Sequence, residues 1–514
     1  APILIYSART REVVVLNGQG PAPRAARPEL FAGQDQIPGN GPLAATVPAV
    51  VDVAALALAR YGTRSLGEVL APAIALADGF PMYEYLRRYL ESEREGCEPY
   101  PSTMRVYYPG GRVPATGEIF RQPDLARTLR ALADAERQAL AAGASREAAI
   151  RAGRDAFYRG PIARRIAAAV REAGGILTEE DLADYEGRIE SPVSMDYRGF
   201  TVYKAGPWTQ GPALLQALAI LEGFDLRAMG PVSTDAIHTT VEAIKLAFAD
   251  RDRYYGDPAF VAVPIAELLS REYAASRRAL IDPWRASLED RPGRPAAWRA
   301  VTTGGRSAAA APRPAPHAPL DGDTTAIEVA DAAGNLFSAT PSSGWLLGGA
   351  FIAGDTGVPM SNRMQAFRLD PASPNVVAGG KRPRTTLTPT IVLREGRPFL
   401  AIGTPGGDSQ DQQILIVLQN VIDFGFDLQR AIEAPRFNSL HPQSSFGDHR
   451  AQPGVLEIET SVPAGVREEL AQRGHRLRLR PPYGIASGVV AAGVDGAGLR
   501  GGADPRRERA IVAW

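Results

Sequence analysis

The chain has 514 residues, of which 45% are hydrophobic and 22% are charged, a composition that excludes general disorder and allows a large buried core. Lysine plus arginine and aspartate plus glutamate both number 57, so the formal net charge is zero, and nucleic-acid binding through a basic surface is not expected. Only Lys204, Lys245 and Lys381 are lysines, and we attribute the arginine bias to codon usage because the arginines are scattered.

The predicted elements change in kind along the chain. Two short strands, at 3–6 and 12–16, precede helical patterns that continue to residue 253, interrupted by a strand-like alternation over 195–204. The helical stretches are 50–61, 65–78, 123–140, 145–173, 212–222 and 234–253, with a further helix start at 178. Residues 286–323 are rich in proline, arginine, glycine and alanine, which predicts a flexible, exposed linker. Strand-like segments at 324–340 and 386–403 and a buried helix at 408–421 follow, so we expect an α/β or α+β protein.

The sequence shows no pattern of a metal centre, a disulfide or a membrane span. Its single cysteine, Cys97, excludes an intrachain disulfide, and the neighbouring glutamates disfavour a reactive thiolate. The five histidines lack ligand spacing, so we expect no metal site. No apolar run reaches the roughly 18 residues that span a bilayer, and residues 1–20 lack a signal-peptide pattern. We therefore expect a cytoplasmic protein.

The end of the linker is the most informative place in the sequence. Thr324 opens a predicted strand that returns as a hairpin after a turn at 331–335, and this structural role alone can explain the segment. If the chain were cut between Asp323 and Thr324, the threonine hydroxyl would lie beside its own α-amine. Such an amine has an ordinary pKa of about 7.7–8.0 and suits a general base, so the pair would be a nucleophile that needs no histidine.

A second motif, Thr404-Pro-Gly-Gly, lies between a predicted strand and the helix at 408–421. Consecutive glycines ahead of a helix can present backbone N–H groups to a negative oxygen, although a simple turn has the same sequence. The motif is not a phosphate loop, because no Gly-Lys-Ser/Thr follows it. The chain also lacks His-Glu-x-x-His and Gly-x-Ser-x-Gly.

These motifs, in this order, resemble the γ-glutamyltranspeptidase family over essentially the whole chain. Further matching motifs begin at Asp155, Gly175, Asp196, Tyr255, Asp331, Ser361, Lys381, Ala434 and Gly502. The resemblance implies an α+β fold, the four-layer αββα sandwich of N-terminal nucleophile hydrolases. It also implies a precursor that cuts itself into a large subunit, residues 1–323, and a small subunit, residues 324–514, which stay together as a heterodimer. No metal or organic cofactor is implied.

The resemblance assigns catalytic roles to residues at matching positions. Cleavage between Asp323 and Thr324 would make Thr324 the nucleophile. Ser342 matches a threonine that hydrogen-bonds this nucleophile, and a serine hydroxyl can do the same. Gly406 and Gly407 match a glycine pair whose backbone amides bind the oxyanion.

The departures from the family concentrate on substrate recognition. Thr385 and Thr386 match a Ser-Ser pair that holds the α-carboxylate of the substrate, although both could simply be strand residues. Gln19 stands where the family has an arginine that pairs with the same group, and Gly344 replaces a ligand asparagine. Ala366 stands where an aspartate receives the α-ammonium, and a semi-buried ammonium without its counter-charge costs several kcal/mol.

An arginine also enters the predicted substrate pocket. Arg363 replaces a glutamine of the family, which favours an acyl group with a carboxylate but no amine, unless Arg363 is a surface residue. The loop 373–381 is shorter than in members with a lid over the site, so we expect an open cleft.

We therefore predict a self-processing amidohydrolase that cleaves a γ-glutamyl or related carboxylate-bearing amide through a threonyl acyl-enzyme, by hydrolysis or transfer. The expected partner is a small-molecule amide, with no nucleic acid and no membrane. The alternatives are an acylase for a non-γ-glutamyl amide and an unprocessed, non-catalytic relative that acts as a binding protein. Because the chain begins later than the family does, we expect either a truncated or processed N-terminus, which could have removed a signal peptide, or N-terminal elements that are dispensable.

Overall fold

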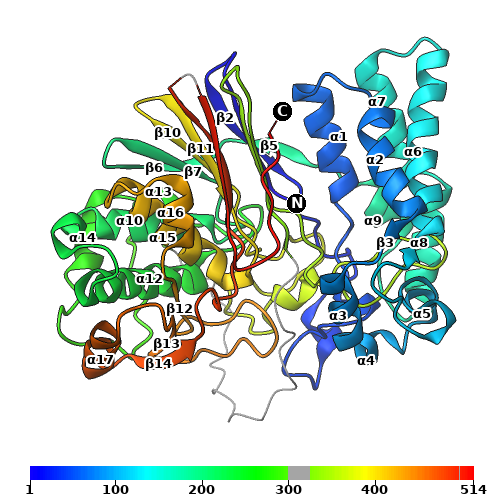
Figure 1. Ribbon diagram of the computed structural model, residues 1–514. Helices are drawn as coiled ribbons and strands as arrows, with labels where there is room; N and C mark the ends of the chain where they lie inside the picture. The colour runs from blue at the N-terminus through cyan, green and yellow to red at the C-terminus, as the bar shows by residue number, and fades with distance from the viewer. Residues whose placement is uncertain (299–323, 346, 497, 514) are drawn as a thin grey trace.

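Two β-sheets stacked face to face form the centre of the molecule (Figure 1). The computed structural model describes residues 1–298, 324–345, 347–496 and 498–513. The five-stranded sheet has the order β5 (Arg188–Glu190), β2 (Glu12–Asn17), β1 (Ile3–Ser7), β9 (Leu336–Ala339) and β8 (Ile327–Ala330). The six-stranded sheet has the order β16 (Gly498–Ala503), β15 (Val490–Asp495), β11 (Arg397–Gly403), β10 (Thr390–Arg394), β7 (Phe200–Lys204) and β6 (Val193–Tyr197).

Each sheet combines strands from both sides of residues 299–323. β1 pairs antiparallel with β9, and β10 pairs antiparallel with β7. Side chains alternate between the faces of a strand, so Leu4 of β1 packs between the sheets while Ile3 and Ile5 face the helices outside. Trp208 and Ile391 complete the apolar layer between the sheets. Neither the region before residue 299 nor the region after 323 therefore contains the whole of either central sheet.

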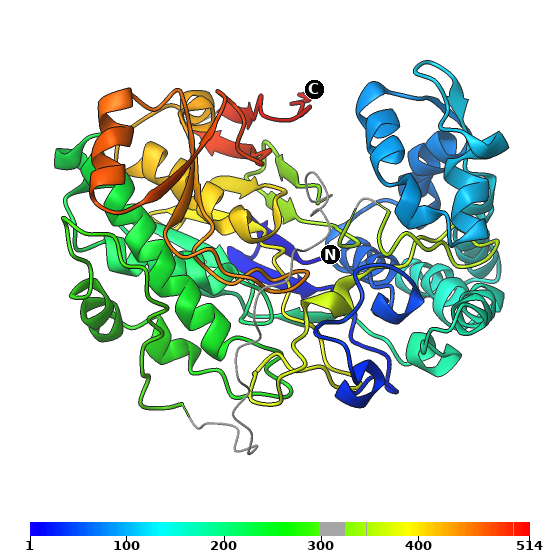
Figure 2. The ribbon, with the colours of Figure 1, turned by 90° about the horizontal axis from the view of Figure 1, so that it is seen from below.

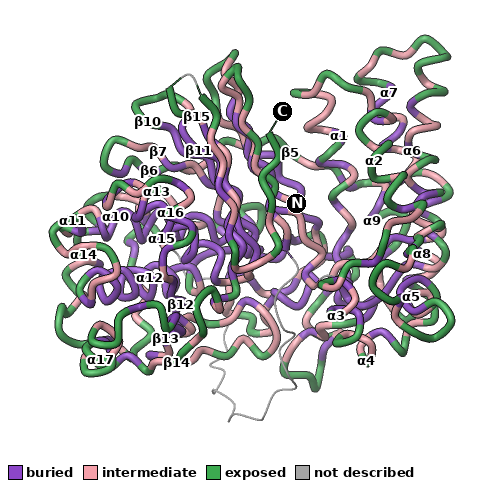
Figure 3. The backbone as a smooth tube through the Cα atoms, viewed as in Figure 1, coloured by how far each residue is buried: buried purple, intermediate pink, exposed green. Residues whose placement is uncertain are grey.

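Helices cover both outer faces, which confirms the predicted αββα arrangement (Figure 2). Outside the six-stranded sheet lie α10 (Gly211–Leu221), α12 (Thr234–Tyr254) and α15 (Gln410–Ile422). On the opposite side, beyond the five-stranded sheet, lie α1 (Val50–Tyr61), α2 (Leu66–Asp78), α6 (Pro123–Ala141), α7 (Arg146–Tyr158) and α8 (Pro161–Glu172). Burial is dense around α10, α12 and α15, beside the six-stranded sheet (Figure 3).

The remaining elements are short. The helices are α3 (Glu84–Ser92), α4 (Arg94–Cys97), α5 (Pro101–Tyr107), α9 (Glu179–Ala183), α11 (Leu226–Met229), α13 (Ile265–Leu268), α14 (Arg271–Arg278), α16 (Leu428–Glu433) and α17 (Ala464–Gln472). The strands are β3 (Phe80–Pro81), β4 (Ile119–Phe120), β12 (Phe437–Ser439), β13 (Val455–Glu459) and β14 (Arg476–Arg480). Among the described residues, no helix is both long and apolar enough to cross a bilayer.

Local signals placed many helix ends correctly. Ser65 caps α2, and its hydroxyl and the Glu68 carboxylate form the capping box expected from their spacing. The helical stretch predicted over 145–173 is two helices, because it is interrupted at Gly160-Pro161, where the proline provides no N–H to continue the first one. The short helices between residues 84 and 107 were not predicted.

The predicted exposed linker is wrong for residues 286–298. Ala286 is buried and its N–H donates to the Arg473 carbonyl at 2.7 Å, while the Gly293 N–H donates to the Asp250 carboxylate at 2.6 Å. The segment therefore packs on α12 and α17, because its backbone groups find partners that its composition does not reveal. The rest of the predicted linker, including Asp323, lies outside the described residues.

One buried carboxyl group lies between the two sheets. Glu328 of β8 faces β11, where its carboxyl occupies the space that a side chain at Gly403 would need. Within the described residues neither carboxyl oxygen makes a well-formed hydrogen bond. Burial raises the pKa of Glu328 well above its usual value, and the nearby Ser338 hydroxyl and Lys204 ammonium only partly offset that shift. Glu328 therefore keeps its proton to a higher pH than an ordinary glutamate does.

We predict that Glu328→Gln stabilises the protein increasingly as the pH rises. The unfolded chain loses this proton near the ordinary glutamate pKa, whereas the folded chain holds it to a higher pH, so raising the pH through that window favours unfolding. The Tm difference between the variant and the wild type should grow as the pH rises above the ordinary glutamate pKa, by up to about 1.4 kcal/mol of unfolding free energy per pH unit. Calorimetry on Glu12→Gln, at the exposed start of β2, is the control. A Tm difference that stays constant with pH contradicts the assignment.

Candidate active site

The pairing of β8 with β9 brings Thr324 and Ser342 together. The two strands form an antiparallel hairpin, and their pairing continues beyond the strands, because the Thr325 N–H donates to the Pro341 carbonyl at 3.1 Å. Extending this register by one more residue on each side sets Thr324 directly opposite Ser342. Side chains of opposed residues lie on the same face of a sheet, so the two hydroxyl groups are neighbours. Thr324 is buried and Ser342 is half-buried.

The glycine motif lies beside the same hairpin. β11 ends at Gly403, and a Cβ added there would lie 3.1 Å from the Ala326 methyl group, two residues after Thr324. The chain then turns through Gly406 (φ +125°) and Gly407 (φ +56°), conformations that residues with a Cβ rarely adopt. The end of β11, from which this turn leaves, therefore lies next to the residues before β8, and the oxyanion role of the turn stays a prediction.

Side chains from the start of α15 hold this turn. The Ser409 N–H and hydroxyl donate to the Gly406 carbonyl at 3.1 and 2.8 Å. The Gln410 amide satisfies its neighbours when its nitrogen donates to the Thr386 and Thr404 carbonyls and its oxygen accepts from the Gly407 N–H at 3.3 Å. The Gly407 N–H, one of the two predicted oxyanion donors, thus already makes a long hydrogen bond within the protein. Its oxyanion role stays a prediction.

The residues predicted to hold the substrate lie on neighbouring segments. Arg363 is buried, so its interpretation as a surface residue is wrong, and its Nη1 donates to the Thr385 hydroxyl at 3.5 Å. The Thr386 hydroxyl is buried and makes no hydrogen bond within the described residues. Gln19 is buried at the end of β2, where its side-chain amide donates to the Gly20 carbonyl at 3.3 Å. A substrate role for Gln19 would require that bond to open.

An aromatic pair that the sequence analysis missed lines the turn. The Phe446 ring lies 3.2 Å from the position that a Cβ on Gly407 would take. Its centroid is 5.2 Å from that of Trp345, and the Arg363 guanidinium lies 5.9 Å from the same ring. Both rings are half-buried, so they form a wall that links the glycine turn to Arg363.

Asp408 connects this wall to the turn. Its carboxylate accepts from the Ser445 N–H at 2.8 Å, from the Ser445 hydroxyl at 2.6 Å and from Arg251 at 2.5 Å. Burial alone would raise the pKa of Asp408, but Arg251 and Ser445 outweigh it and hold that pKa below its usual value. The sequence signal for this contact was the position of Asp408 directly after Gly406 and Gly407.

Among the described residues, guanidinium groups outnumber carboxylates around the turn. Arg251 and Arg384 are buried with Asp252 and Asp408 as their ion-pair partners. Arg368 adds a third cation, and desolvation together with Arg384 lowers the pKa of Arg368 to about 10. Arg363 lies close by, and these guanidinium groups favour an anionic ligand.

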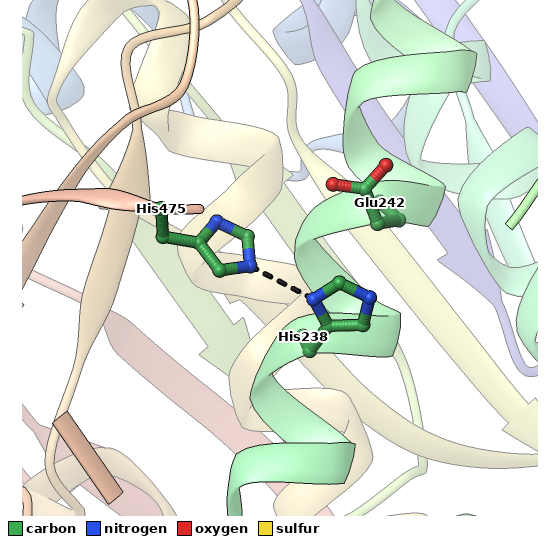
Figure 4. A group of neighbouring side chains, drawn as sticks. All are labelled: His238, Glu242 and His475. Atoms are coloured by element: carbon green, nitrogen blue, oxygen red, sulfur yellow. Dashed lines mark hydrogen bonds between the residues drawn. The ribbon is translucent and has the colours of Figure 1, made fainter. Parts of the chain in front are cut away.

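A cluster of His238, Glu242 and His475 lies elsewhere in the molecule (Figure 4). His238 donates from Nε2 to a backbone carbonyl at 2.8 Å, so its Nδ1 accepts from His475 Nε2 at 2.9 Å. Burial, followed by the charge of Lys245, lowers the pKa of His475 to about 2, so this ring is neutral. Lys245 and Arg291 already neutralise Glu242, at 2.5 and 3.0 Å. These cations disfavour a divalent metal ion, and we interpret the cluster as a structural link between α12 and the segment before β14.

Comparisons with known proteins agree with this geometry. The family described as Gamma-glutamyltranspeptidase matches residues 2–514. The Acylase ACY 1 proenzyme of a Pseudomonas species is 34% identical over 92% of this chain and 76% of its own length. The Glutathione hydrolase-like YwrD proenzyme of Bacillus subtilis is 33% identical over 99% of this chain and 88% of its own length. The crystal structure of a cephalosporin acylase from Bacillus halodurans has a TM-score of 0.84 at 30% identity and covers 100% of this chain and 86% of that chain.

We predict that Gly406→Ala abolishes most amide hydrolysis. An alanine Cβ would lie 2.5 Å from the Ser409 hydroxyl and 2.9 Å from the Ala486 carbonyl, at a φ that disfavours alanine. The turn must move, and loss of one oxyanion donor lowers kcat by about 10²–10³-fold. Gly425→Ala, also at positive φ but with open space around it, is the control for backbone strain. Equal kcat values of the two variants with an acyl p-nitroanilide would rule out a role for the turn.

Proposed function

The chain belongs to the γ-glutamyltranspeptidase family, and from this premise we propose that Thr324 is its nucleophile and that it cleaves amides whose acyl group carries a carboxylate without an α-amine. Membership makes the chain an enzyme of a hydrolase family, and the names of its relatives as proenzymes fit processing into two subunits. The observation that carries the nucleophile is the register that sets Thr324 opposite Ser342 beside the glycine turn.

Self-cleavage would proceed without any other catalyst. The Thr324 hydroxyl attacks the carbonyl of Asp323, the peptide C–N bond breaks, and the Thr324 nitrogen takes the proton to become a free amine. Water then hydrolyses the ester at Asp323, which leaves a carboxylate there and an N-terminal threonine. The large and small subunits remain joined, because both sheets contain strands from each of them.

The same threonine would then attack a substrate amide. Its α-amine takes the hydroxyl proton, and Ser342 orients the reacting groups. Backbone amides of the turn at Gly406 and Gly407 stabilise the negative oxygen of the tetrahedral intermediate. The amine leaves with the proton, an acyl ester forms on Thr324, and water hydrolyses that ester to regenerate the nucleophile.

Two features support a carboxylate-bearing acyl group without an amine. Arg363 is a buried cation beside Thr385, in a part of the described structure where guanidinium groups outnumber carboxylates. Ala366, on the same short turn as Arg363, is buried and offers no counter-charge to an ammonium. One relative is named an acylase and one neighbouring structure a cephalosporin acylase, which fits this choice.

Hydrolysis of γ-glutamyl peptides such as glutathione is the second candidate. Thr385 and Thr386 retain the hydroxyl pair that the family uses for an α-carboxylate, and one relative is named glutathione hydrolase-like. The two candidates differ only in whether the pocket accepts an α-ammonium, so substrates that differ by that group separate them.

Thr324→Ala should stop self-cleavage. We expect the wild-type chain to yield a fragment of residues 324–514, and the variant to stay intact, because a methyl group cannot attack a carbonyl. Thr325→Ala, on the adjacent residue whose side chain faces the other side of the hairpin, should still be cut. Intact-mass spectrometry during incubation measures all three chains. A fragment that appears at the same rate in Thr324→Ala would exclude this nucleophile.

Arg363→Gln should change acyl selectivity. We expect wild-type kcat/KM to be higher for glutaryl p-nitroanilide than for the γ-glutamyl and pentanoyl p-nitroanilides. The variant should lose about tenfold or more on the glutaryl compound, the equivalent of about 1.4 kcal/mol, and much less on the pentanoyl one, because only the former offers a carboxylate to the guanidinium.

The matched control is Arg430→Gln, because Arg430 stacks at 4.1 Å on Phe426 of a segment that follows α15. It should leave all three kcat/KM values unchanged. A wild-type preference for the γ-glutamyl compound would favour the second candidate, and equal losses on the glutaryl and pentanoyl compounds would exclude a carboxylate contact.

A further inference from the structure

We propose that Lys204, paired with Asp411, is a positioning residue that holds the glycine turn against the hairpin of Thr324 and thereby sets the rate of acyl transfer. The inference rests on Thr324 as the nucleophile of the proposed function and is independent of the acyl group. It starts from a buried polar network, between the six-stranded sheet and the helices α10 and α15, that the mechanism above does not use.

Lys204 is fully buried at the end of β7, yet its ammonium is completely satisfied. Its Nζ lies 2.8 Å from an Asp411 carboxylate oxygen, 2.7 Å from the Thr390 hydroxyl and 3.1 Å from the Thr388 carbonyl. An ammonium has three hydrogens, and three acceptors surround this one. A planar guanidinium with five donors could not be satisfied in the same space.

The scarcity of lysine supports a specific role for this ammonium. All three lysines of the chain are buried, at 0%, 4% and 2% exposure for Lys204, Lys245 and Lys381. Each donates to a carboxylate or a backbone carbonyl. Codon usage explains why arginine is abundant but not why every remaining lysine lies in the interior. We infer that lysine occurs at these three buried positions because each requires a compact ammonium.

Asp411 transmits this contact to the glycine turn. It lies in the first turn of α15, which follows Gly407 directly, and its Oδ1 also accepts from the Thr388 hydroxyl at 2.7 Å. The neighbouring Gln410 binds the Thr404 carbonyl at one end of the turn and the Gly407 N–H at the other. Fixing the first turn of α15 therefore fixes the glycine turn.

The same network reaches the hairpin of the nucleophile. The Thr390 N–H donates to the hydroxyl of Ser338 in β9 at 3.1 Å, while the Thr390 hydroxyl binds Lys204. Glu328 of β8 brings its carboxyl over Gly403, in the field of the Lys204 ammonium. The network around the Lys204 ammonium thus positions two parts of the site. It supports Thr324 through β8 and β9, and the glycine turn through α15. A misplacement of about 1 Å between such groups can cost about 10²-fold in rate.

The chain contains a matched control for stability. Lys245 pairs with Glu242 at 2.5 Å, both residues are buried, and they belong to the structural histidine cluster rather than to the turn. Removing one partner of a buried pair leaves an uncompensated charge and destabilises a protein wherever the pair lies. Lys204→Met and Lys245→Met should therefore both lower Tm, Lys245→Met by less because Arg291 still pairs with Glu242 at 3.0 Å. Rates compared well below the Tm of each variant then separate a positioning role from lost stability.

The test compares these two variants with the wild type in the full-length protein. The readouts are self-cleavage rate during cell-free synthesis, Tm, and kcat and KM with glutaryl and γ-glutamyl p-nitroanilide. We expect Lys204→Met to slow self-cleavage and lower kcat by about tenfold or more, with KM within about twofold, and Lys245→Met to change neither rate by more than about twofold. Wild-type rates in Lys204→Met, or equal losses in both variants, would overturn the proposal.

Two further variants keep the test decisive if Lys204→Met fails to fold. Asp411→Asn preserves volume and should lower kcat at constant KM, so wild-type kcat in this variant would overturn the proposal. Lys204→Met combined with Asp411→Leu removes both charges and should regain thermal stability without regaining the rates. Wild-type rates in the double variant would overturn the proposal as well.

Self-cleavage separates this proposal from the one on acyl selectivity. If the wild type cuts itself but hydrolyses neither anilide, the proposed acyl group fails, while the comparison of self-cleavage rates still decides the role of Lys204. A wild type that neither cuts itself nor hydrolyses either anilide removes Thr324 as the nucleophile and overturns both proposals.

Discussion

The antiparallel pairing of β8 with β9 is the interaction on which the site depends. It sets Thr324 opposite Ser342, and a slip of one residue would turn the nucleophile to the opposite face of the sheet. β1 lies against β9, so a strand from the start of the chain supports the hairpin from its other side. Cutting the chain before Thr324 frees an amine without freeing the strand, because backbone pairing on β8 and β9 does not require the preceding peptide bond.

The chemistry of the pocket follows from buried charge. A buried cation is costly unless an anion accompanies it, and among the described residues the guanidinium groups near the glycine turn outnumber the carboxylates. Arg363 and the half-buried Phe446 and Trp345 rings place this positive region next to the turn. The proposed recognition residues thus contact the glycine turn through Phe446 and Gln410, so their packing and that of the turn are connected.

Much of the fold and part of the site could be predicted from sequence because their signals are local. Ser65 and Glu68 predict the start of α2, and the consecutive glycines Gly406 and Gly407 predict a turn ahead of a helix. The hairpin that carries Thr324 follows from its own strand and turn pattern. The order of motifs determined family membership, and with it the four-layer arrangement, before any contact between distant residues was known.

Tertiary structure alone decided which distant groups meet. Residues 286–298 have the composition of a linker but pack because α12 and α17 supply partners for their backbone groups. Lys204 and Asp411 are 207 positions apart in the chain, and no local pattern predicts that one buried ammonium joins them. Sequence by itself determined the family and many of the elements, and it predicted the reacting residues, because these signals lie within a few positions of one another. The charge balance, the aromatic wall and the buried network depend on long-range packing, which local sequence does not encode.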